Sequence, residues 1–154
     1  RRHLRGQHTA AGLGGNVADG EKGFNAAAYN AYLSEEKRLM GVRCRACGKL
    51  SAVPRPLCIS CHGTEMEWYE FSGKARLSTF TCISVVPASM AQRGYGRDNP
   101  CCTGVVTLEE GPRVSARITR VDGNNPQDIE TGMDLVLDLE ELGPENPSPT
   151  FRPA

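Results

Sequence analysis

Four of the seven cysteines occur in two closely spaced pairs, a pattern typical of metal ligands. Cys44 and Cys47 form one C-x-x-C pair, and Cys58 and Cys61 form a second pair after a linker of ten residues. Each tight turn presents two sulfurs, and a linker of this length lets the two turns face each other. The spacing therefore predicts a tetrahedral four-thiolate site, a zinc ribbon that holds a single structural zinc.

Residues 58–62, CISCH, also match the motif that attaches haem in c-type cytochromes. A haem would leave Cys44 and Cys47 without a role and would need an oxidising export route and a second axial ligand, so we favour zinc. Iron in a rubredoxin-like arrangement remains open, because four thiolates also suit iron. Four thiolates leave no coordination position for water, so we expect a structural metal with His62 outside the site.

The other three cysteines, Cys82, Cys101 and Cys102, lie within strand-like patterns in the second half of the chain. A nucleophilic cysteine needs a base such as histidine nearby, and every histidine of the chain precedes Gly63. We therefore expect no catalytic residue and assign these cysteines to the core as small side chains. Without an evident export signal, we expect a cytoplasmic protein whose thiols stay reduced.

The composition is that of a soluble globular protein without bias toward a charged partner. The 154 residues include 18 basic and 18 acidic side chains, and 39% are hydrophobic. No stretch approaches the roughly 18–20 apolar residues that a membrane span needs. Residues 77–142 carry five basic side chains against ten acidic ones, which disfavours a polyanion partner.

The elements expected around the cysteine pairs divide the chain into five segments: a flexible leader (1–22), an N-terminal helix (23–41), the zinc ribbon (42–66), an OB-fold barrel (67–142) and a proline-rich tail (143–154). Residues 24–40 are Ala-rich, and Gly41 follows them as a helix stop. Tyr29, Leu33 and Met40 fall on one side at helical spacing, so the helix is expected to dock on another surface.

Period-two alternation predicts the strands of the barrel. A long strand is expected over 71–86 with a bend at Ser72-Gly73, and further strands follow over 101–110, 113–121 and 133–142. Val114 and Ile118, for example, alternate with Arg113 and Arg117, which gives that strand one wet face. Four to five antiparallel strands of this kind fit a small closed barrel. The predicted class is mainly β, with an N-terminal helix.

Short motifs follow one another in a distinctive order: R-C-x-x-C-G, P-R, C-x-x-C, W-x-x-x-S-G, F-T, G-P-R and G-M-D-L. Their residues are Arg43, Cys44, Cys47, Gly48, Pro54, Arg55, Cys58, Cys61, Trp68, Ser72, Gly73, Phe80, Thr81, Gly111, Arg113, Gly132 and Met133. In this order, from about Phe24 to Leu142, the chain resembles the acyl-CoA-associated zinc-ribbon/OB-fold family, once catalogued as a domain of unknown function. It departs from the family pattern in the segment Lys74-Ala75-Arg76, where another glycine is expected.

The resemblance implies a rubredoxin-like zinc ribbon followed by a small OB-fold barrel. It also implies a non-catalytic accessory subunit that assembles with thiolases, thiolase-like aldolases or hydratases, which bring the catalytic residues. Within the family, the chain most resembles the small subunit of a benzoylsuccinyl-CoA-type thiolase of aromatic degradation. That likeness implies a hetero-oligomer with a thiolase-like large subunit and CoA-dependent cleavage of a β-ketoacyl-CoA.

Coenzyme A carries phosphates and an adenine, which basic and aromatic side chains recognise. The candidates for contact with CoA or with the partner are Arg43, Arg45, Lys49, Arg55, Arg93, Tyr95 and Arg97. Taken singly, each of them is better explained as an ordinary solvated side chain.

Three alternatives remain open from the sequence. The first is an accessory subunit of an acyl-CoA hydratase or aldolase. The second is a single-stranded nucleic-acid module, since ribbons and OB barrels commonly bind single strands, although the acidic barrel half with few aromatic residues disfavours it. The third is an electron carrier with iron in the ribbon.

Overall fold

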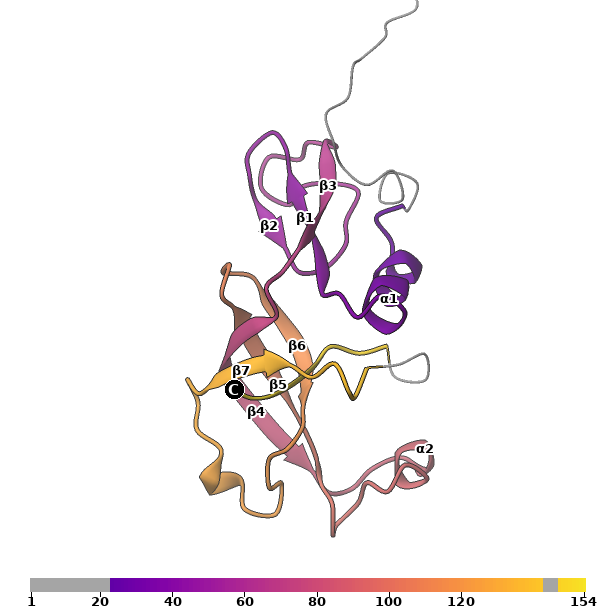
Figure 1. Ribbon diagram of the computed structural model, residues 1–154, viewed down its shortest axis with the longest axis vertical. Coiled ribbons are helices and arrows are strands. Elements are labelled where there is room, and N and C mark those ends of the chain that lie inside the picture. Colours follow the sequence, from indigo (N-terminus) through magenta and orange to yellow (C-terminus); the bar gives the residue numbers. More distant parts are fainter. Residues whose placement is uncertain (1–22, 143–146) are drawn as a thin grey trace, which may run out of the picture.

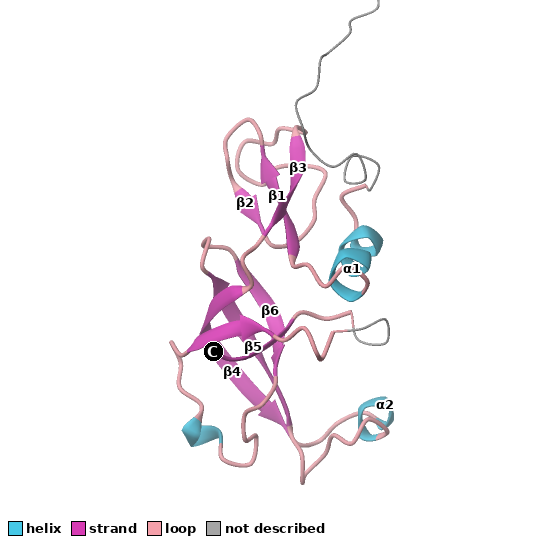
Figure 2. Ribbon diagram, in the orientation of Figure 1, coloured by secondary structure: helices cyan, strands magenta, loops and turns pink. Residues whose placement is uncertain are grey.

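The structure, a computed structural model, describes residues 23–142 and 147–154. The leader expected at 1–22 lies outside the described residues. The described chain forms a three-stranded sheet at one end of the long axis and a closed five-stranded barrel at the other (Figure 1). Strands dominate and helices are few and short (Figure 2), so the predicted mainly β class, with a ribbon before a small barrel, is confirmed.

The N-terminal helix α1 spans Ala26–Ser34 and is shorter than the sequence predicts. Asn25 caps it, because its side-chain oxygen accepts a hydrogen bond from the Ala28 amide at 2.9 Å. The chain then reverses at Lys37, which has a φ of 56°. Met40, expected on the helix, instead begins the first strand. The residues after Ser34 also favour a helix in the sequence. The helix nevertheless ends there, because Met40 and the residues that follow it pair in the sheet.

The ribbon sheet has the order β2-β1-β3, in which β1 is Met40–Cys44, β2 is Leu50–Ser51 and β3 is Met66–Glu70. Both outer strands pair with β1 in antiparallel register. The sheet therefore brings the first cysteine pair, which follows β1, close to the second pair, which precedes β3.

The long strand expected over 71–86 is shorter in the structure and belongs to the barrel alone. β3 ends at Glu70 in the ribbon, and β4, Lys74–Ile83, begins the barrel. Gly73 separates them at a φ of 80°, and a Cβ there would lie 3.2 Å from Leu137 Cβ. The expected bend is thus a crossing between sheets, and the barrel's own register shift lies further on, between Leu77 and Thr79.

The barrel closes in the order β4-β5-β6-β8-β7, with β5 at Cys101–Leu108, β6 at Arg113–Ile118 and β7 at Asp134–Leu137. Two short helices lie in its loops, α2 at Ala88–Ala91 and the 3-10 turn η1 at Pro126–Asp128. Leu77, Val106 and Leu135 are among the buried core residues. On β6 the apolar side chains point inward as the alternation predicts.

The segment expected as a proline-rich tail contributes a strand to this barrel. β8, Thr150–Pro153, lies between β6 and β7, parallel to the first and antiparallel to the second. Phe151 on β8 is fully buried in the core. The prediction of a tail was wrong for these residues, because four prolines in residues 143–154 hide a strand whose pairing partners are distant in sequence.

Two of the three remaining cysteines form a disulfide, which corrects the prediction of reduced core thiols. Cys82 on β4 and Cys102 on β5 lie directly opposite each other, and their sulfurs are bonded. Cys101 is buried and free, as expected of a core side chain. The disulfide could not be predicted because the strand register, rather than the sequence separation of 20, brings the two residues together.

Candidate metal centre and contact surfaces

The four cysteines predicted as ligands come together at the end of the ribbon. All four sulfurs lie within 4.8 Å of one another. The Sγ atoms of Cys44 and Cys61 are 3.5 Å apart, and those of Cys47 and Cys58 are 3.6 Å apart. A tetrahedral zinc with Zn–S bonds of about 2.3 Å requires sulfur separations of roughly 3.8 Å. The cluster therefore fits a tetrahedral ion without rearrangement of the backbone.

Two similar turns position these sulfurs. The amide of Gly48 donates to the Cys44 carbonyl at 2.8 Å, and the amide of His62 donates to the Cys58 carbonyl at 3.0 Å. Gly48 and His62 occupy equivalent places after each pair, and both have positive φ, at 76° and 59°. The second turn therefore adopts the left-handed conformation at a non-glycine residue, His62. Gly63 matters for space, since a Cβ there would lie 3.3 Å from Cys61 Sγ.

Within the cluster, the thiol pKa values of Cys58 and Cys61 are shifted in opposite directions. Backbone amides of Cys61 and Ser60 lower the pKa of the Cys58 thiol to about 6, so this sulfur is a thiolate at neutral pH. The Gly63 amide lowers the pKa of Cys61, but the crowding sulfurs of Cys44 and Cys47 outweigh it and raise that pKa to about 12. A metal ion that replaces the thiol protons removes this unfavourable crowding of the sulfurs.

Aromatic side chains join the helix to the ribbon behind the cluster. The ring of Trp68 on β3 lies 5.4 Å from that of Phe24 and 5.0 Å from that of Tyr32 on α1. A small set of buried residues, Val42, Cys44, Cys58 and Met66, completes this packing. The helix thus docks within the same chain: Tyr32 packs on the ribbon, and Tyr29 and Leu33, two residues of the expected face, pack in the larger core cluster shared with the barrel.

Two of the predicted basic contacts are engaged within the ribbon. Arg43 and Arg45 both form ion pairs with Glu67, at 2.5 and 3.0 Å. Arg43 also lies over the Tyr69 ring, 5.5 Å from its centroid. Partial burial raises the pKa of Glu67, but the two guanidinium groups outweigh it and hold the pKa below its usual value. The positive charges of Arg43 and Arg45 are therefore already neutralised in part by Glu67.

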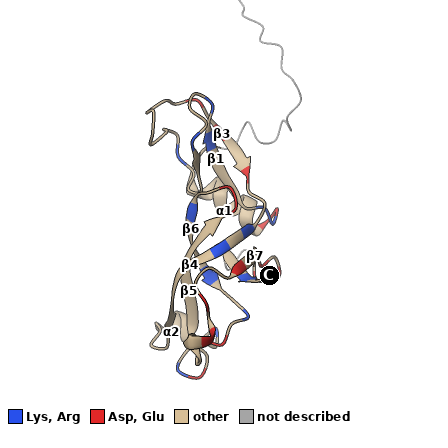
Figure 3. Cartoon of the chain, turned by 90° about the vertical axis from the view of Figure 1, so that its left-hand side faces the viewer, with Lys and Arg blue, Asp and Glu red and all other residues tan. Residues whose placement is uncertain are grey.

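The remaining basic candidates form two separate groups. Lys49 and Arg55 are exposed on the ribbon. Arg93, Tyr95 and Arg97 lie in the loop around α2, at the opposite end of the long axis (Figure 1). The structure does not bring the predicted contacts together into one surface. Basic and acidic side chains are interspersed along the chain (Figure 3), with no continuous basic track on the described strands.

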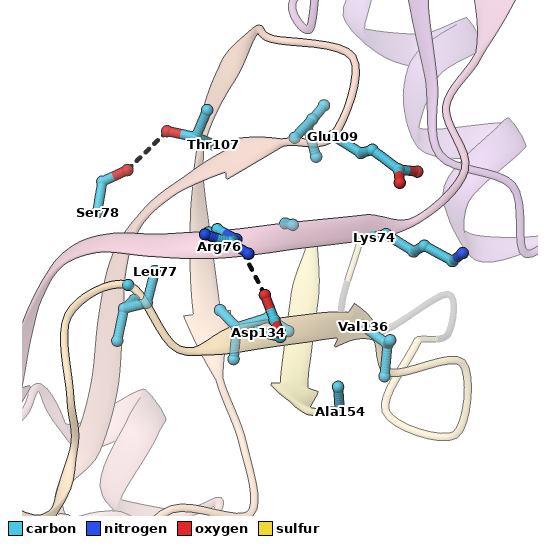
Figure 4. Close-up of a pocket in the computed structure, with 13 residues that line it drawn as sticks. Lys74, Arg76, Leu77, Ser78, Thr107, Glu109, Asp134, Val136 and Ala154 are labelled. Carbon is cyan, nitrogen blue, oxygen red and sulfur yellow. Dashed lines mark hydrogen bonds and ion pairs between the residues drawn. The ribbon is translucent and has the colours of Figure 1, made fainter.

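A groove of about 740 Å³ follows β4 on the outside of the barrel, between β5 and β7. Figure 4 shows Arg76 directed at Asp134, with an ion pair of 3.0 Å, and Ser78 hydrogen-bonded to Thr107 at 2.6 Å. Lys74 and Glu109 add one charge of each sign at the right-hand end of this view. Because these charges balance, the groove is poorly suited to a polyanion.

Sequence analysis missed the role of Arg117. It lies on the predicted wet face of β6, yet its side chain is only 14% exposed. It donates hydrogen bonds to Tyr95 Oη at 2.8 Å and to Glu141 at 2.9 Å, and so ties the α2 region to the barrel. Alternation predicted that the side chain points outward, but it could not predict that a loop 20 residues away covers it.

Among the described residues, no helix is both long and apolar enough to cross a bilayer.

Comparisons with protein families match both parts of the chain. Residues 35–67 match the family described as the ChsH2 rubredoxin-like zinc ribbon domain, and residues 68–140 match the ChsH2 C-terminal OB-fold domain. The two matches meet where β3 leaves the cysteine cluster.

Relatives and a solved structure show the same pair of domains. A "DUF35 domain-containing scaffold protein" of Pyrococcus furiosus is 33% identical over 109 residues, which cover 71% of this chain and 74% of that protein. A "probable enoyl-CoA hydratase alpha subunit" of Thermomonospora curvata is 31% identical, covering 79% of this chain but 35% of that protein. The solved "Ltp2-ChsH2(DUF35) aldolase" matches with a TM-score of 0.68 and 27% identity, over 86% of this chain and 97% of that chain.

Proposed function

Because the chain belongs to the DUF35 family, in which a ChsH2-type zinc ribbon precedes an OB-fold domain, we propose that it is a non-catalytic accessory subunit of an acyl-CoA enzyme complex. One observation carries the proposal: the ribbon and barrel together match nearly the whole of one chain in the Ltp2-ChsH2(DUF35) aldolase. The names of the relatives, a scaffold protein and a hydratase subunit, agree with it. The proposal includes a cytoplasmic location.

Cys44, Cys47, Cys58 and Cys61 would hold a structural zinc in this subunit. The sulfur separations and the ionised Cys58 support this assignment. Four thiolates close the coordination shell, so the ion would hold the two turns together and would not activate water or substrate. Its contribution is to the fold of the ribbon and, through Trp68, to the placement of α1.

The barrel cysteines have no place in catalysis under this proposal. Cys82 and Cys102 are bonded to each other, and burial raises the pKa of the Cys101 thiol. A thiol with a raised pKa is a poor nucleophile at neutral pH. The reacting thiolate and the acid–base groups would therefore belong to the large subunit.

The finer proposal is a thiolase of the benzoylsuccinyl-CoA type, in which the complex cleaves a β-ketoacyl-CoA with free CoA. The resemblance over residues 29–44 and 80–87 supports it. An acyl-CoA hydratase or aldolase is the alternative, favoured by the names of two of the similar proteins. Within any of these complexes Lys49 and Arg55, both exposed, are candidates to contact the CoA phosphates.

The test is reconstitution. The tagged full chain is purified from its native cells, and co-purifying proteins are identified by mass spectrometry. The chain alone, the partner alone and the mixture are then assayed for cleavage, hydration and aldol reactions of acyl-CoA esters. We expect turnover only when the partner is present. Turnover by this chain alone would contradict the accessory role, and the reaction observed decides between thiolase, hydratase and aldolase.

A further inference from the structure

The chain between β4 and β5 forms a projecting loop, residues 84–100, called here the α2 loop. Its helix, α2, buries none of its four residues. The loop stands away from the barrel wall at the end opposite the ribbon (Figure 1). A single helical turn is marginal in water unless one face is packed. The α2 loop is therefore suited to a contact outside this chain.

Apolar side chains gather at the base and in the first turn of the α2 loop. Val85 is 80% exposed and Ile83 is 40% exposed. Met90 on α2 is partly exposed, and together with Ile83 and Pro149 it lines a cavity of about 390 Å³. Single exposed apolar residues are ordinary, but several beside a concavity are typical of a protein-binding surface.

Two contacts hold the α2 loop to the barrel, one at its base and one beyond α2. The disulfide between Cys82 and Cys102 joins the two strands at its base. Further along, Tyr95 accepts the hydrogen bond from Arg117, whose guanidinium lies 6.0 Å from the Tyr95 ring centroid. A loop already held in its bound shape loses less conformational entropy on association.

The charge of the α2 loop differs from that of the strands beside it. The loop carries Arg93 and Arg97 against Asp98, whereas residues 101–142 carry three basic side chains against nine acidic ones. A protein surface with carboxylates around an apolar recess complements the loop and is repelled by the rest of the barrel. The charges therefore favour docking through this loop over docking through the barrel wall.

We propose that the α2 loop is the surface by which this chain docks on the catalytic subunit of its acyl-CoA enzyme, with Val85 in an apolar recess ringed by carboxylates. The inference rests on the proposed function, which supplies the partner. The ribbon offers the competing surface, where Val53 and Leu57 are exposed between the two cysteine pairs and Ile59 is exposed within the second pair. Ile59, at 53% exposed, provides a matched control.

The experiment uses the full chain and the acyl-CoA enzyme subunit that co-purifies with it. Binding of the wild type, Val85→Asp and Ile59→Asp is measured by calorimetry, after their melting temperatures are shown to agree. A buried charge at an interface centre weakens binding by about 30-fold or more, so we expect that loss for Val85→Asp and less than about 3-fold for Ile59→Asp. Arg97→Glu should slow association, most strongly at low salt.

The other outcomes separate the two proposals. Unchanged binding of Val85→Asp, or a loss confined to Ile59→Asp, would overturn docking through the α2 loop and leave the accessory function intact. Failure of any acyl-CoA enzyme to co-purify would overturn both. Sedimentation of the chain alone adds one more arm: a dimer that Val85→Asp dissolves would show that the loop binds a second copy, against the proposal.

Discussion

The ribbon and the barrel are stabilised by different means. Four buried residues make up the apolar cluster of the ribbon, and two of them are the cysteines Cys44 and Cys58. The barrel, by contrast, has a continuous core that also takes in Leu33 from α1 and Leu39 and Phe71 from the connecting segments. A sheet of three short strands buries too little apolar surface to be stable alone, so a metal site must replace the missing core.

The difference predicts that loss of the metal unfolds one region and spares the other. Cys44→Ser or Cys61→Ser should release zinc and unfold the ribbon, because a site of this kind supplies folding free energy on the order of 10 kcal/mol. Metal analysis and hydrogen exchange, resolved by region, should show ribbon amides exchanging freely while β4–β7 stay protected. His62→Ala should keep its zinc, and loss of metal in that variant would contradict the four-cysteine assignment.

The stability of the barrel should depend on its apolar core rather than on the metal. Phe151→Ala removes a fully buried ring from β8 and should lower the free energy of unfolding by about 3–5 kcal/mol. Leu139→Ala, at a side chain 50% exposed, is the control and should change stability by less than about 1 kcal/mol. Denaturant unfolding followed by circular dichroism measures both. Equal effects would mean that residues 150–153 do not form a strand of the barrel.

The disulfide gives the barrel a covalent constraint of its own. Cys82→Ala should cost about 3 kcal/mol, the value for a loop of similar length, whereas Cys101→Ala should cost roughly 1 kcal/mol through lost packing. A reductant should lower the stability of the wild type toward that of Cys82→Ala. The stability difference between the wild type and Cys101→Ala should stay unchanged. Neither variant should alter turnover of the assembled complex more than a few fold. A wild type insensitive to reductant would show that these thiols are not bonded.

The smallest effect concerns the ion pairs of the ribbon. The lowered pKa of Glu67 means that its carboxylate stabilises the fold above its ordinary value of 4.5, and this contribution is lost as the pH falls through the lower folded value. Glu67→Gln should therefore be less stable than the wild type at pH 7, by less than about 1 kcal/mol. Thermal melts at a series of pH values should show the stability gap between Glu67→Gln and the wild type closing in acid. A gap that widens in acid would contradict the assigned partners, Arg43 and Arg45.

The sequence by itself determined the four-cysteine cluster, because C-x-x-C turns are local structures. Cys44 and Cys47 are held by a hydrogen bond from Gly48, and the second pair is held in the same way. Alternation along β6 likewise determined which side chains face the core. Each of these features depends on residues within a few positions of one another, and their spacing is therefore visible in the chain.

Tertiary structure alone decided the features that join distant segments. β8 is a strand because β6 and β7 supply its hydrogen-bond partners, although its prolines indicate a tail. Cys82 meets Cys102 through the register of β4 and β5, and Arg117 is covered by Tyr95 from the α2 loop. The seven basic and aromatic contact candidates lie at opposite ends of the molecule, although the sequence offers no reason to separate them. Closure of the barrel sets these relationships, because it fixes which strands are neighbours irrespective of their order in the chain.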